Sequence, residues 1–180
     1  MKSLKEYIYE VSLNEGLLDR VKNKEVDHKV LIEEFLKENY KIYGAYTIKE
    51  TNNNKFVVDV KGRVVVKNRD ITSLTNGVFE FGSAGSDFYC SWCAKLTTLE
   101  GAPQKVGGNF GCNDCKSLKS LEGAPKEVRE AFNCSYCKSL TSLEGAPEKV
   151  GWVFKCNNCG VKFTEDDVRK YTTVADDIYV

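Results

Sequence analysis

The chain has 180 residues, of which 42% are hydrophobic, and its 26 acidic and 26 basic residues give a net charge of zero. This balance disfavours a general binder of nucleic acid or of anionic membranes, because such binding relies on clustered positive charge. No apolar run approaches the roughly 18 residues that a membrane-spanning helix needs. We therefore expect one domain with an N-terminal extension, no nucleic-acid or membrane partner, and a cytosol that keeps the thiols reduced.

The first fifteen residues predict a short amphipathic helix. Ser3 and Glu6 form a candidate capping box, and apolar residues recur at helical spacing from Leu4 to Glu10. A break with small residues follows at Leu13-Asn14-Glu15-Gly16. From the residues alone, this helix is a terminal element that packs on the core.

The same segment resembles the capsid-targeting peptides of internal head proteins in T-even-like phages. The letters MKSLKEYIYE carry this resemblance, together with Leu13-x-Glu15 before Gly16. In that family a prohead protease removes the peptide after a Leu-x-Glu motif. The resemblance implies that residues 1–15 are cleavable, that the mature chain begins at Gly16, and that the protein resides in a phage virion and then in the host cytoplasm. A bacterial cytoplasmic protein is the alternative.

Residues 16–43 follow a helical pattern. Asp27 is a candidate N-cap for a helix in which Val30, Leu31, Phe35 and Leu36 share one face. The only histidine, at position 28, lies at the start of this helix, and we assign it to the surface.

Residues 44–85 predict strands followed by an irregular first repeat. Segments 46–48, 56–60 and 64–66 have strand composition, and asparagines 52–54 form a turn between the first two. Counting back nine residues from Leu74, as Cys90 stands nine residues before Leu99, puts Val65 at the place of a first cysteine and Asn68 at that of a second. We expect an entry coil here, with the N-terminal helices over the end of the core.

Residues 86–160 repeat one pattern every 22 residues. The repeated positions are the pairs Cys90/Cys93, Cys112/Cys115, Cys134/Cys137 and Cys156/Cys159, the phenylalanines Phe88, Phe110, Phe132 and Phe154, and the Gly-Ala-Pro motifs that begin at Gly101, Gly123 and Gly145. A fixed interval of this length predicts a solenoid, in which each coil stacks on its neighbours. Phe110 and Cys112 then point inward from a short strand in a parallel ladder.

The order V-x-x-x-F-x-C-x-x-C-x-x-L-x-x-L resembles the leucine-rich repeat, and the wording CKSLTSLEGAP is similar to tandem repeats of tailed phages and gut bacteria. The pattern departs from that family by using Phe and Cys where leucines are usual, and by closing with Gly-Ala-Pro. The resemblance implies an α+β fold: a parallel-strand, leucine-rich-repeat-like solenoid, or a flatter variant, with an N-terminal helical extension and a C-terminal capping helix.

Residues 161–180 leave the repeat. Thr164 and Asp167 predict a capping box for a helix from Glu165 to about Tyr171. Ile178 and Val180 either add a last strand or pack on the core. A helix here would cover the end of the open ladder.

The cysteine pairs have the C-x2-C-x18-C-x2-C spacing of thiolate metal sites. Zinc would then bind to one set of Cys90, Cys93, Cys112 and Cys115 and to a second set of Cys134, Cys137, Cys156 and Cys159. In the alternative, the first cysteine of each pair is a small buried hydrophobic residue, and the second occupies a turn position. We favour this alternative and expect no cofactor, because Val65 and Asn68 do not suit zinc and because the cysteine interval equals the phenylalanine interval.

Outward positions of the coils predict a surface for protein recognition. The candidate residues are Tyr89, Trp92, Asn113, Asp114, Tyr136 and Asn157. Tryptophan and tyrosine often anchor protein interfaces, although Trp92 and Tyr136 could instead only stack on neighbouring coils. No histidine accompanies a cysteine, so we do not expect an enzyme. The expected function is a protein-binding module, as a phage internal head protein delivered to the host; the alternative is a zinc-stabilised structural protein of a virion or scaffold.

Overall fold

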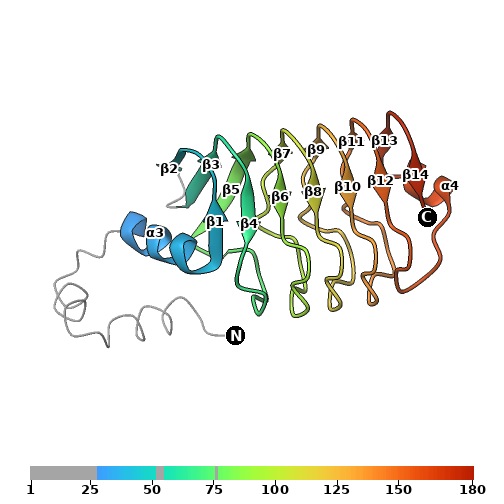
Figure 1. The fold of residues 1–180 in the computed structure, drawn as a ribbon, viewed down its shortest axis with the longest axis horizontal. Coiled ribbons are helices and arrows are strands. Elements are labelled where there is room, and N and C mark those ends of the chain that lie inside the picture. Colours follow the sequence, from blue (N-terminus) through green and yellow to red (C-terminus); the bar gives the residue numbers. More distant parts are fainter. Residues whose placement is uncertain (1–27, 52–54, 76) are drawn as a thin grey trace.

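The computed structural model describes residues 28–51, 55–75 and 77–180. They form a stack of coils whose strands make up two sheets (Figure 1). The first sheet contains β1 (Tyr40–Ile42), β4 (Val64–Val66), β6 (Phe88–Tyr89), β8 (Phe110–Gly111), β10 (Phe132–Asn133), β12 (Phe154–Lys155) and β14 (Ile178–Tyr179), in that order. The second contains β2 (Tyr46–Glu50), β3 (Phe56–Val60), β5 (Phe79–Ala84), β7 (Lys105–Val106), β9 (Glu127–Val128), β11 (Lys149–Val150) and β13 (Thr173–Val174).

The pairing confirms the predicted parallel solenoid. Strands from β4 to β14 are parallel, as are those from β3 to β13, and only β1 and β2 join their sheets antiparallel. Each step between full coils pairs residues 22 apart, such as Phe110 with Phe132. The predicted strands at 46–48 and 56–60 are β2 and β3 of the second sheet, but the continuation of this sheet through the later coils was not predicted. Val106, Val128 and Val150 are the buried residues of its short strands.

A column of phenylalanine rings runs along the core. Phe88, Phe110, Phe132 and Phe154 are completely buried. Their ring centroids are 5.6, 5.4 and 5.1 Å apart, and the first three rings are within 6° of parallel. The column continues into the N-terminal end as Phe81, whose ring meets Phe88 edge to face at 5.2 Å. One continuous aromatic core therefore joins the coils.

The Gly-Ala-Pro corners need glycine for two reasons. Gly101, Gly123 and Gly145 have φ angles of +84°, +84° and +81°, which side chains rarely adopt. A Cβ at Gly123 would also lie 2.4 Å from the backbone nitrogen of Glu100 in the preceding coil. The corner therefore determines how closely the coils approach.

Charged residues alternate on the outer face of the second sheet. Lys105, Glu127 and Lys149 occupy paired positions on β7, β9 and β11. The Lys105 ammonium lies 3.3 Å from the Glu127 carboxylate, and both side chains are more than half exposed. Such an exposed pair contributes little to stability by itself, about 0–1 kcal/mol.

Helix α3 (His28–Asn39) packs at the N-terminal end of the stack, where Ile32 and Leu36 join the core. The expected helical region 16–43 therefore ends early, because residues 40–42 form β1 against β4. The predictions for residues 1–27, including the helix at 4–10, the Asp27 cap and the cleavage residues Leu13, Glu15 and Gly16, lie outside the described residues. Neither helix in the described ranges is long and apolar enough to cross a membrane.

The entry coil exists, but its predicted alignment is wrong by one residue. Val64 pairs with Phe88 and Val65 with Tyr89, so Val66 is the residue in line with Cys90. Val66 is fully buried, as Cys90 is. Asn68 uses its side-chain amide to bind the Asn39 side chain at 2.8 Å and thereby connects this coil to the end of α3.

The C-terminal segment extends the solenoid. Helix α4 (Glu165–Arg169) has the predicted capping box between Thr164 and Asp167. After it, β13 pairs with β11 and β14 pairs with β12, so both sheets gain one more strand. Residues 161–180 therefore form a further partial coil. In the chain, α4 follows β12 and precedes β13 and β14.

The phenylalanine column generates a stability prediction. Phe110→Ala should lower the free energy of unfolding by about 3–5 kcal/mol, because it leaves a cavity between two stacked rings. Urea denaturation followed by circular dichroism measures the change. The exposed Lys119→Ala serves as control and should change stability by less than about 0.5 kcal/mol. An equally small loss for Phe110→Ala would contradict the role of the column.

Candidate functional site

The eight cysteines lie in two columns inside the coils. All of them are buried except Cys159, which is partly exposed. In the last three cysteine-containing coils, the second cysteine donates its thiol hydrogen to the carbonyl of the first cysteine in the coil before: Cys115 to Cys90 at 3.2 Å, Cys137 to Cys112 at 3.1 Å and Cys159 to Cys134 at 3.3 Å. The thiols therefore bridge consecutive coils.

Burial determines the acid–base behaviour of most of these thiols. It raises the pKa of Cys90, Cys112 and Cys134 well above the ordinary value, and it raises the pKa of Cys156 to about 12. The pKa of Cys159 is instead lowered, mainly by its hydrogen-bonding contact with the Cys134 thiol. A thiol whose pKa is raised stays protonated near neutral pH and is a poor nucleophile and metal ligand.

The structure does not bring the cysteines together as the zinc alternative requires. Within residues 28–51, 55–75 and 77–180, which include all eight cysteines, no group of three or more Cys, His, Asp or Glu side chains is placed to hold a metal ion. The hydrogen bonds described above explain why: the second cysteine of one coil faces the backbone of the coil before it. Neither predicted set of four thiols forms a tetrahedral site.

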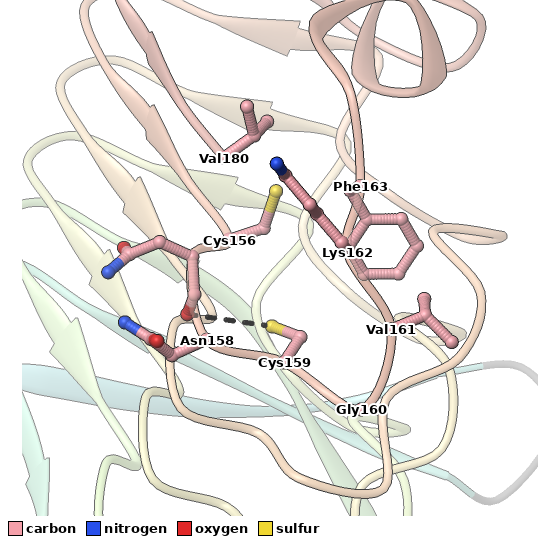
Figure 2. Close-up of a pocket in the computed structure, with 9 residues that line it drawn as sticks. Cys156, Asn158, Cys159, Gly160, Val161, Lys162, Phe163 and Val180 are labelled. Atoms are coloured by element: carbon pink, nitrogen blue, oxygen red, sulfur yellow. Dashed lines mark hydrogen bonds between the residues drawn. The ribbon is translucent and has the colours of Figure 1, made fainter.

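A cavity of about 540 Å³ lies at the C-terminal end of the stack, and Cys156, Cys159, Lys162 and Val180 are among the residues that line it (Figure 2). Cys159 also contacts the Asn157 carbonyl there, at 3.9 Å. The chain's single histidine, at position 28, begins α3, which packs at the opposite end of the stack (Figure 1). The cavity thus holds one protonated thiol and one partly exposed thiol, without an imidazole to act as base.

Each cysteine-containing coil has one non-glycine residue in the left-handed conformation, immediately before its second cysteine. The four residues are Trp92, Asp114, Tyr136 and Asn158, with φ angles of 67°, 59°, 62° and 58°. Backbone hydrogen bonds along the ladder fix three of them: the amides of Trp92, Asp114 and Tyr136 donate to carbonyls of the following coil at 2.9 to 3.0 Å. We call these four residues the left-handed row.

Trp92 and Tyr136 project from the left-handed row into solvent. Their exposed fractions are 61% and 46%. The structure gives neither ring an aromatic or cationic partner among the described residues, whereas two other exposed tyrosines have one: Lys41 and Arg63 lie over Tyr43, and Lys155 lies over Tyr179. Within the described ranges, neither ring stacks on another aromatic ring of a neighbouring coil.

The other predicted recognition residues lie beside the row and have structural contacts. Tyr89 is half-buried, and its ring lies over Gly111, where an added Cβ would approach it to 2.8 Å. Asn113 and Asn157 accept hydrogen bonds of 2.6 Å from the hydroxyls of Ser91 and Ser135, one coil earlier. These three residues therefore connect coils, and Asp114 is the predicted residue that lies between the two exposed rings.

Trp152 is a further exposed aromatic residue that we did not predict. Its exposed fraction is 55%. It precedes β12 in the chain, whereas the residue of the left-handed row in this coil follows β12. The equivalent positions in the two preceding coils are Gly108 and Glu130, so no repeated aromatic marks this position. Its tryptophan identity at a non-repeated position was the one signal available.

Comparisons of this chain with protein-family models, with curated proteins and with solved structures found no match.

Thiol labelling tests the description of the cysteines. At pH 7 a disulfide reagent should modify about one of the eight thiols in the native protein, and Cys159→Ala should abolish that reaction. Denaturation should release all eight and serves as the control for reagent and protein amount. Zinc-bound thiolates would contradict this result, because a chelator added to the native protein would then make several further thiols reactive.

Proposed function

We propose that this chain is a non-enzymatic, protein-binding repeat module whose contact residues include Trp92 and Tyr136. The observation that carries the proposal is the combination of a bulky aromatic side chain, high exposure and a positive φ angle at both positions. The left-handed conformation disfavours an L-residue by about 1–2 kcal/mol, and asparagine and aspartate are the types that tolerate it best.

The same row supplies the internal comparison. Asp114 and Asn158 fill the equivalent position with a tolerant residue type, so the coil itself does not require an aromatic side chain there. Trp92 and Tyr136 keep 61% and 46% of their surface exposed. Because they combine conformational strain with this exposure, we assign them to an intermolecular contact, in which tryptophan and tyrosine are the common energetic anchors.

The stack holds the two anchors in a defined arrangement. Trp92 and Tyr136 lie two coils apart, which is roughly 10 Å at the usual strand spacing. Ladder hydrogen bonds at 2.9 and 3.0 Å fix their backbones. An anchor pair that is already ordered loses little conformational entropy on binding, and this favours affinity.

The raised thiol pKa values and the remote histidine favour binding over catalysis. The finer likeness to leucine-rich repeats rests on the repeat order, while the second sheet distinguishes this solenoid from a single-sheet horseshoe.

We extend the proposal to the location of the protein. It is an internal head protein of a phage, processed after Glu15 and delivered to the host cytoplasm, with a bacterial cytoplasmic protein as the alternative. The N-terminal sequence pattern supports this extension.

The double variant Trp92→Asn/Tyr136→Asn tests the binding proposal. It should abolish capture of a specific host protein from lysate, and binding of that protein once purified. It should also raise the free energy of unfolding by about 1 kcal/mol per site, because asparagine relieves the left-handed strain. Pull-down with mass spectrometry, isothermal titration calorimetry and urea denaturation provide the measurements.

Tyr171→Asn is the matched control, because Tyr171 has the same 46% exposure as Tyr136 and lies outside the row. This variant should retain binding. Unchanged binding by the double variant would exclude the proposed anchors, and a loss of stability in it would show that the rings are structural.

The processing proposal has its own test. Protein isolated from phage particles should begin at Gly16, and chain produced alone in bacteria should keep the residues before it. Replacement of Glu15 by Gln should block removal. N-terminal mass spectrometry distinguishes the forms, and a Met1 terminus in particle-derived protein would rule out the processing.

A further inference from the structure

We propose that Trp92, Asp114 and Tyr136 together receive one basic side chain, lysine or arginine, of the partner protein. This inference rests on the proposed function and specifies its partner as a protein with an exposed basic segment. The three residues occupy the same position in three consecutive coils, so an aspartate stands between two exposed aromatic residues in the row. We call them the aromatic–acid site.

The spacing suits a cation. Adjacent coils are roughly 4.8 Å apart, so each ring is anchored about 5 Å from Asp114 and about 10 Å from the other ring. A cation above Asp114 can therefore lie within the roughly 6 Å of both ring centroids that cation–π attraction requires. The negative faces of both rings and the carboxylate then act on the same charge.

This protein already uses the same chemistry elsewhere. Lys41 and Arg63 lie 5.0 and 4.4 Å from the ring centre of exposed Tyr43, and Lys155 lies 5.4 Å from that of Tyr179. Trp92 and Tyr136 have no such cation from the described part of the chain, although they are at least as exposed as Tyr43. Their exposed ring surface can therefore meet a cation from another molecule.

Asp114 is also available. The one hydrogen bond to its carboxylate comes from the neighbouring Asn113 amide at 3.2 Å, and no ion pair of the described residues includes it. Two lysines of the chain lie near Asp114 in the sequence: Lys116 follows Cys115, and Lys138 follows Cys137 in the next coil. Lys138 is occupied, since it donates to the Asn158 carbonyl at 2.9 Å, and Lys116 is exposed to solvent.

The carboxylate decides which partner fits. An apolar or acidic side chain placed between the rings would bury Asp114 without a counter-charge, which is unfavourable. A lysine or arginine instead gains both ring faces and a charge-assisted contact with the carboxylate. Charge complementarity therefore commits the site to a basic side chain.

Trp92 fluorescence allows a direct test without the natural partner. Trp152→Phe leaves Trp92 as the only tryptophan of the chain. In this background, the peptide acetyl-Gly-Arg-Gly-amide and its lysine equivalent should change the emission saturably in the millimolar range. The citrulline peptide, which has the arginine shape without its charge, should produce no saturable change.

Variants then isolate the site. Asp114→Asn should weaken the arginine peptide about tenfold and remove the salt dependence of binding. This variant keeps the fold, because asparagine already fills the equivalent position at 158. Tyr136→Asn should weaken the peptide similarly. Glu122→Gln, an equal charge change at an exposed residue of the same coil, should leave the peptide affinity unchanged.

The outcomes separate this inference from the proposed function. Equal response to the arginine and citrulline peptides, or unchanged affinity in Asp114→Asn, would overturn the basic-side-chain site. The proposed function would still stand if Trp92→Asn/Tyr136→Asn abolished partner binding. If that double variant bound the partner normally, the proposed function would fail whatever the peptides showed.

Discussion

The structure depends on parallel, in-register stacking of one 22-residue coil on the next. Stacking lets each phenylalanine ring cover the ring before it, and it lets each inner thiol reach the backbone of the preceding coil. The same register places one left-handed residue per coil in a straight row. An insertion between the phenylalanine and the second cysteine of a coil would shift the ring column, the thiol column and the row together.

The solenoid could be predicted because the repeat appears directly in the residues. A fixed interval for Cys, Phe and Leu requires that equivalent positions meet, and the paired strands bear this out. The repeated strands β7, β9 and β11 of the second sheet could not be predicted in the same way, because each is two residues long and contributes a single buried valine. A segment that short has no alternation to recognise.

The entry coil shows where counting fails. Between its buried strand and Leu74 there are eight steps, from Val66, where the later coils have nine, as from Cys90 to Leu99. Counting back at the later interval therefore pointed to Val65. At the candidate site, sequence alone identified the exposed aromatics but not their backbone strain, because tryptophan and tyrosine do not suggest a positive φ. The aspartate and asparagine of the same row were the available signal.

The alternating charges on the second sheet have a consequence for assembly of the fold. Near-identical coils can pair with the wrong neighbour, and the phenylalanine column would accept such an error. If β9 were left out, Lys105 on β7 would lie directly opposite Lys149 on β11, and like charges opposite each other on adjacent strands are unfavourable. The Lys–Glu–Lys order thus gives neighbouring coils opposite charges at this position. A surface contact that is weak in the finished protein therefore disfavours mispaired folding intermediates.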